Sequence, residues 1–318
     1  MPSKTPSPHD QFARKVFGNP ETAADLFKNY TENAVAKAVD WSQIKSLPKQ
    51  EFGEIFDERI FDLLFSAPLK KKGQDSFAMI LTEHKSEPDP NLMLQVGTYL
   101  FLAWSRYWRN AKKPNLKNKP LPAPVIVVLY NGGKPWKPPE MQEIVTRVPG
   151  LEEYIPKFKV WMIDLAKLDL TQIKGKPSTR AALEALKRAG DKTISTNLVN
   201  VLAHLKKESL TVQIKNQVRD ILVYADSVKK LVAEQVKNAL DSIFPEKGGD
   251  IMAHVMLDDY KVEGKAEAVV AFLSTRFGDL PEEMVQAIAK VKGHKKVDKL
   301  VTLAAACQSI DEFAEALK

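Results

Sequence analysis

Two carboxylates and a lysine stand at or near the ends of two apolar stretches of the sequence. Asp62 lies within RIFDLLFS, and Glu83 and Lys85 follow the run FAMIL. Alternate side chains of a strand share a face, so Glu83 and Lys85 would point the same way and His84 would point to the opposite face. If the two stretches pair as neighbouring strands, Asp62 would lie near Glu83 in one pocket.

Such a pocket suits a divalent cation. Mg²⁺ and Mn²⁺ take oxygen ligands and keep several waters when the protein supplies few carboxylates. A cation held in this way polarises a phosphoryl oxygen and makes a bound water more acidic. A lysine such as Lys85 could orient that water or stabilise the charge of the transition state. The pattern therefore suits hydrolysis of a phosphodiester; the alternative is that Asp62 and Glu83 are strand-end residues that face solvent.

Gln95 and Tyr99 are four residues apart, which places them on one face of a helix. That helix follows the strand of Glu83, so its start would cover the same pocket. Gln95 could contact a metal-bound water or a phosphate, and Tyr99 could hold a phosphate through its hydroxyl. The alternative is a polar residue near a helix start and a half-buried tyrosine. At His84, which faces away from Glu83, we expect a hydrogen-bonding histidine rather than a base.

The elements that must position these residues form a mixed α/β pattern. A helix between two neighbouring strands predicts a parallel crossover unit, and the lysine-rich run at 70–73 predicts a hairpin turn. Strand patterns largely stop after residue 175, and the remainder has the spacing of helices. We therefore expect a mixed-sheet domain at 1–175 and an α-helical region at 176–318. The expected elements of the first domain are helices within 10–39, with Asp10 capping the first turn and a second helix starting near Pro20, strands at 59–66 and 76–85, a helix at 91–110, and strands at 125–130 and 159–165.

Composition narrows the class of protein. The chain has 318 residues, of which 44% are hydrophobic and 27% charged, as in folded soluble proteins. It has no apolar run of the length that spans a membrane, and its first residues do not resemble a secretion signal. Its one cysteine, Cys307, excludes an internal disulfide. We expect a cytoplasmic protein with no membrane partner.

The net charge of +7 is unevenly placed. Residues 91–139 contain eight basic residues and no acidic one, together with three tryptophans and several other aromatic residues. Basic side chains interleaved with aromatic ones suit a polyanion with flat faces, such as a nucleic acid. The alternative is a solvated loop next to a helix whose aromatic side chains face the core. The basic residues that we predict to contact DNA are Arg106, Arg109, Lys112 and Lys113.

The order Asp62, Glu83-His84-Lys85, Gln95-x-x-x-Tyr99 resembles the PD-(D/E)XK nuclease signature with the Q-x-x-x-Y extension of RecB-like nucleases. More closely, the chain resembles the recombination-promoting nuclease family, often labelled putative transposase (YhgA-like). The resemblance covers 9–165 well and the rest loosely. Its further supporting segments are His9-Asp10-x-Phe12, Pro20-Glu21-Thr22-Ala23, Glu83-His84-Lys85-Ser86-Glu87-Pro88-Asp89, Tyr130-Asn131-Gly132 and Arg276-Phe277-Gly278-Asp279-Leu280-Pro281.

The resemblance implies a restriction-endonuclease-like mixed sheet flanked by helices and an Mg²⁺- or Mn²⁺-dependent DNA endonuclease linked to recombination or mobile elements in a bacterium. It implies that Asp62 and Glu83 bind the metal and that Lys85 is catalytic, with Gln95 and Tyr99 completing the catalytic set. In the wider superfamily an early acidic residue often completes the metal site, and the candidates here are Asp10 and Glu21.

Two features depart from the family. Many members have Gln at the position of Lys85, and many have Tyr-His-Gly in place of Tyr130-Asn131-Gly132. The helical region would dock substrate, bind a partner or form a homo-oligomer. The alternative function is a non-catalytic nucleic-acid-binding or protein-interaction module on a nuclease fold.

Overall fold

The computed structural model describes residues 7–47, 62–70, 77–110 and 120–245, and discontinuous parts of 247–317. The chain forms two compact units, residues 1–243 and 244–318. The sequence-based boundary at residue 175 falls inside the first unit, where the described elements change from strands to helices.

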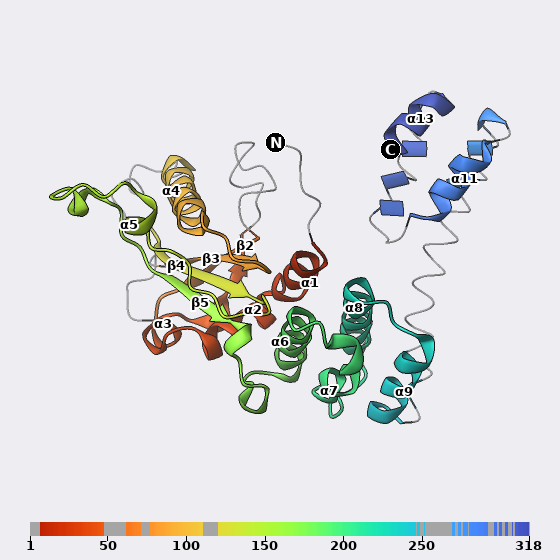
Figure 1. Cartoon of the computed structure of the whole chain (residues 1–318), viewed down its shortest axis with the longest axis horizontal. Helices are drawn as coiled ribbons and strands as arrows, with labels where there is room; N and C mark the ends of the chain where they lie inside the picture. The colour runs from red at the N-terminus through yellow and green to blue at the C-terminus, as the bar shows by residue number, and fades with distance from the viewer. Residues whose placement is uncertain are drawn as a thin grey trace. The chain divides into compact units, whose positions relative to one another are not determined.

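The first unit is built on a mixed five-stranded sheet in the part of the chain that the structure describes, with strand order β1-β2-β3-β4-β5 (Figure 1). The first three strands pair antiparallel, and β3, β4 and β5 pair parallel. The predicted β2–β3 pairing and the predicted parallel crossover through α4 are confirmed. The strands and the crossover helix are β1 (Lys45–Ser46), β2 (Leu63–Pro68), β3 (Phe77–Lys85), α4 (Leu92–Asn110), β4 (Ala123–Tyr130) and β5 (Val160–Asp164).

Helices cover both faces of this sheet (Figure 1). One face packs against α4, where Leu81 and Val128 of the sheet join Val96 of the helix in one buried cluster. On the other face, Phe27 of α2 contacts Phe65 of β2 edge to face. Each fully buried side chain of this kind contributes about 1.5–3 kcal/mol. β3 is therefore a central strand with buried residues on both sides, and only its last residues reach a polar environment.

The first helices begin at sequence signals of two kinds. α1 (Pro8–Phe17) starts with a capping box, in which the Ser7 side chain accepts the N–H of Asp10 and the Asp10 carboxylate accepts the N–H of Ser7. The prediction that Asp10 begins the helix was therefore wrong by three residues, because Ser7 provides the N-cap. α2 (Pro20–Tyr30) begins where predicted, with Asn19 as N-cap.

The remaining described elements are short or helical. No described strand follows β5, as the sequence predicts. No described helix is long and apolar enough to cross a membrane. The remaining elements of the first unit are α3 (Asn33–Ala38), η1 (Trp41–Gln43), α5 (Met141–Ile144), η4 (Glu152–Tyr154), η5 (Leu165–Lys167), η6 (Leu170–Gln172), α6 (Pro177–Gly190), η7 (Ile194–Thr196), α7 (Leu198–Ala203), α8 (Val212–Val228) and α9 (Ala233–Ile243). The second unit has α11 (Glu282–Ala289) and α13 (Ile310–Leu317) among its described residues.

Candidate active site

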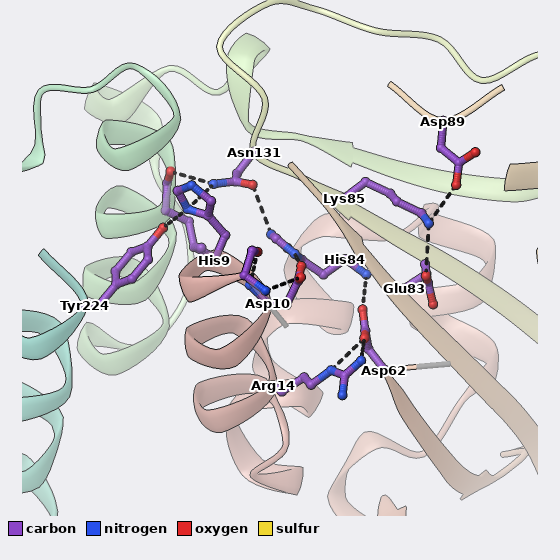
Figure 2. A network of polar contacts seen from close by, with 12 residues as sticks. His9, Asp10, Arg14, Asp62, Glu83, His84, Lys85, Asp89, Asn131 and Tyr224 are labelled. Carbon is purple, nitrogen blue, oxygen red and sulfur yellow. Dashed lines mark hydrogen bonds and ion pairs between the residues drawn. The ribbon is translucent and has the colours of Figure 1, made fainter. Parts of the chain in front are cut away.

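The predicted catalytic residues gather where β2 begins, where β3 ends and where α4 starts. Leu63 pairs with Thr82 in the antiparallel ladder, so Asp62, one residue before β2, lies beside the end of β3. Glu83 and Lys85 stand on the α4 side of β3, and α4 brings Gln95 and Tyr99 over them. Figure 2 shows Asp62, Glu83 and Lys85 with their charged neighbours.

Lys85 is the centre of a polar cluster. Its Nζ donates to Gln95 Oε1 at 2.9 Å and lies 3.2 Å from Glu83 Oε1 and 2.8 Å from Asp89 Oδ2. Burial works to lower the pKa of Lys85, but the nearby carboxylates outweigh burial and raise it above its ordinary value. Lys85 is therefore held as a cation among acidic and amide groups.

Gln95 connects the helix to the strand. Its amide nitrogen donates to Glu83 Oε1 at 3.2 Å and to the hydroxyl oxygen of Tyr99. Burial, aided by the charge of Glu83 and opposed by the Gln95 hydrogen bond, raises the pKa of Tyr99 to about 12. The hydroxyl of Tyr99 therefore stays protonated near neutral pH and can donate a hydrogen bond.

Glu83 is the most unusual group of the cluster. It is 7% exposed, and its Oε2 is buried without a hydrogen-bond partner among the described residues. Burial and the neighbouring charge of Asp62 raise the pKa of Glu83 to about 8, although Lys85 and Arg14 act in the opposite direction. A buried carboxyl oxygen without a partner is costly, and a divalent cation would supply the missing contact. The Oε2 of Glu83 therefore fits such an ion.

Asp62 is held by both of its carboxylate oxygens. Oδ1 accepts from Arg14 Nε at 2.7 Å and lies 2.5 Å from Arg14 Nη2. Oδ2 accepts from the backbone N–H of His84 at 2.6 Å. Sequence reasoning missed Arg14. The available signal was its position four residues after Asp10 on the same helix, where both side chains share a face.

His84 points to the face of β3 opposite Glu83, as predicted. Its side chain is buried, with Nδ1 2.7 Å from Asp10 Oδ1 and Nε2 3.0 Å from Asn131 Oδ1 (Figure 2). The Asn131 amide nitrogen donates to the carbonyl of Leu186 at 3.3 Å. The prediction of a hydrogen-bonding core histidine is confirmed, and its partners are Asp10 and Asn131.

The two accessory acidic residues lie in different surroundings. The described contacts of Asp10 are with Ser7 and His84; burial works to raise its pKa, but these hydrogen bonds outweigh burial and lower it to about 2. Glu21, whose side chain is 67% exposed, pairs with Lys176. No described contact joins either residue to Asp62 or Glu83, so the structure does not bring them into the candidate metal site.

The residues predicted to bind DNA are only partly described. Arg106 and Arg109 lie near the end of α4, whereas Lys112 and Lys113 fall outside the described residues.

Among the described residues, no group of three or more His, Cys, Asp or Glu side chains is arranged to hold a metal. A cation at Asp62 and Glu83 would therefore take its other ligands from water or substrate, as Mg²⁺ commonly does.

Fold and site together define a mixed α/β protein with a buried cluster of two carboxylates and a lysine at the end of its central strand. The chain belongs to the family described as "Putative transposase, YhgA-like", whose model matches residues 7–217. The match contains every described strand and the whole candidate site, and this membership confirms the resemblance to the YhgA-like family seen in the sequence. Family membership suggests a function related to mobile elements. Neither the curated proteins nor the solved structures contain a match.

Proposed function

We propose that the protein is an Mg²⁺- or Mn²⁺-dependent DNA endonuclease with a PD-(D/E)XK fold. The observation that carries this proposal is the buried Oε2 of Glu83, which lacks a described partner and lies in a carboxylate pair beside a lysine. A group kept in such an unfavourable state inside a folded protein is characteristic of functional sites. The order of the residues along the chain and the family membership support the same class of reaction.

The chain's own residues have separable roles in this proposal. Asp62 and Glu83 would hold the cation, which when bound would polarise a phosphoryl oxygen and acidify a water. Lys85 keeps its proton, because its pKa is raised, and therefore acts as a cation and hydrogen-bond donor rather than as a base. Gln95 hydrogen-bonds to both Lys85 and Glu83 and so fixes their relative positions. The hydroxyl of Tyr99 can donate to a phosphate oxygen.

Metal affinity should increase with pH. Without the cation, Glu83 is protonated at neutral pH, because its pKa is raised to about 8, and it must lose this proton to bind metal. The Mn²⁺ affinity is therefore expected to rise by up to about tenfold per pH unit below 8 and to level off above it. Calorimetric titration in two buffers of different ionisation enthalpy would measure both the affinity and the proton released. An affinity independent of pH, with no proton release, would contradict the assignment.

The experiment that tests the function is a plasmid-nicking assay with Mg²⁺ or Mn²⁺. Wild-type protein is expected to convert supercoiled plasmid into nicked or linear DNA, and EDTA and the Glu83→Ala variant should both prevent this. Circular dichroism of the variant must show a retained fold, because an unfolded variant would make Glu83 structural. Wild-type protein that shifts DNA in a gel but never cuts it, whichever metal is added, would instead indicate a binding module.

A further inference from the structure

Helix α1 contacts the candidate site through two side chains on one of its faces. Asp10 and Arg14 are four residues apart, and both reach residues at the end of β3 or beside it. Asp10 contacts the imidazole of His84, and Arg14 contacts Asp62. Neither His84 nor Arg14 has a part in the chemistry proposed above.

These contacts form a closed ring. From Asp10 the ring passes to the His84 side chain, through the His84 backbone N–H to Asp62 Oδ2, and from Asp62 Oδ1 to Arg14 and back to the same helix (Figure 2). The β2–β3 ladder brings Asp62 beside β3, but no ladder pair fixes its side chain, because Asp62 precedes the first residue of β2. Arg14 of α1 and the backbone N–H of His84 instead fix the carboxylate of Asp62.

The other side of the His84 ring is also fixed. The Leu186 carbonyl is an acceptor, so the Asn131 amide must direct its nitrogen towards it and its oxygen towards His84 Nε2. Asp10 offers an acceptor to Nδ1. The imidazole therefore has two distinct contacts, one to α1 and one to the end of β4, and each can be removed separately.

We propose that α1 is a positioning clamp for the candidate metal site, in which Asp10 fixes His84, and Arg14 together with the His84 backbone amide fixes both oxygens of Asp62. The proposal rests on the proposed function only in treating Asp62 as a metal ligand. Asp10, Arg14 and His84 are thus positioning residues. In this proposal Asp10 acts through His84 and does not bind the metal.

A matched pair of substitutions at His84 separates the two sides of its ring. The side-chain nitrogen of Asn is as many bonds from Cβ as Nδ1 of His, and that of Gln is as many bonds from Cβ as Nε2. His84→Asn can therefore keep the Asp10 contact, whereas His84→Gln can keep only the Asn131 contact. His84→Gln is expected to weaken Mn²⁺ binding by about tenfold or more, as is typical when a group that orients a metal ligand is lost, and His84→Asn should bind much as wild type does.

Calorimetric Mn²⁺ titration and thermal unfolding would be measured together on both variants. His204→Gln is the control, since it makes the same change at a histidine that pairs with Glu184 and has no described hydrogen bond to α1 or to the clamp residues. Equal Mn²⁺ affinity in His84→Gln and His84→Asn would overturn the proposal. A loss in His204→Gln as large as that in His84→Gln would do so too, because general destabilisation would then explain both.

A second test needs neither metal nor a buried substitution. Arg14 is 34% exposed, and Arg14→Gln removes the guanidinium that holds Asp62. The amide of His84 is then expected to exchange its hydrogen about tenfold faster or more, because its acceptor is no longer fixed by a charged partner. Lys15→Gln removes the same charge from the next residue of the helix, which pairs with Asp220, and should leave this amide unchanged.

The Mn²⁺ titration and the amide-exchange measurement test different parts of the proposal. If wild-type protein binds no Mn²⁺, the proposed metal site fails while amide exchange still decides whether Arg14 holds Asp62. If Arg14→Gln leaves the exchange of the His84 amide at the wild-type rate, the clamp is refuted whatever the metal does.

Discussion

Glu83→Gln is expected to abolish metal-dependent cleavage and, at the same time, to raise the thermal stability of the protein at neutral pH. Gln keeps the shape of the side chain and the hydrogen bond to Gln95 but cannot supply the negative charge that holds a cation. Cleavage should fall by on the order of a hundred- to a thousandfold or more, as for other losses of transition-state electrostatics.

The gain in stability follows from the raised pKa of Glu83. The folded state favours the protonated form, so the contribution of Glu83 to stability is complete below its ordinary pKa of 4.5 and is lost as the pH rises from there to about 8. Gln stays neutral at every pH. The melting temperature of Glu83→Gln should therefore exceed that of wild type by on the order of a few degrees near pH 8, and the two should converge in acid.

Glu184 provides a matched control for this prediction. It is a second buried carboxylate, 4% exposed, but it is paired with Arg188 at 2.6 Å and His204 at 2.7 Å. Burial works to raise its pKa, but these partners lower it, so Glu184→Gln should reduce stability at neutral pH and leave cleavage intact. If differential scanning calorimetry shows the Glu83→Gln and Glu184→Gln variants destabilised to the same extent, Glu83 is a structural residue.

The local pattern of the sequence was enough to predict the arrangement of the site around β3. The two-residue period of a strand places Glu83 and Lys85 on one face and His84 on the other, and the structure confirms this. The lysine-rich run between the two apolar stretches predicts the pairing of β2 and β3, which brings Asp62 beside Glu83. Both inferences depend on short-range geometry that every strand shares.

The contacts that secure the site depend on long-range packing, which no local period encodes. Arg14 meets Asp62 across 48 residues, and His9 meets Tyr224 across 215 residues. Which side chains of α1 reach the sheet is decided by how the helix docks, and Ser7 rather than Asp10 begins that helix. The sequence therefore predicted that Asp62, Glu83 and Lys85 lie together, but it did not predict the residues that hold them in place.

Lys85→Met is expected to lose cleavage while keeping its metal. Met retains most of the length of the side chain, but it cannot stabilise negative charge on a phosphate or donate to a water. Cleavage should fall by about a hundredfold or more. Lys230→Met, which removes an exposed lysine paired with Asp226, is the matched control and should cut as wild type does.

Two opposing electrostatic effects decide how this variant binds metal. Lys85 lowers the pKa of Glu83, so its removal makes that carboxylate harder to ionise near neutral pH and weakens binding there. Removal of Lys85 also removes a positive charge close to the cation, which strengthens binding at every pH. Calorimetric titration should therefore show that Mn²⁺ binding is retained near neutral pH, where the two effects offset each other, and is at least as tight as in wild type once the pH is well above 8. A variant that binds Mn²⁺ poorly even there would mean that Lys85 holds the carboxylates in position, and its role as a catalytic cation would have to be abandoned.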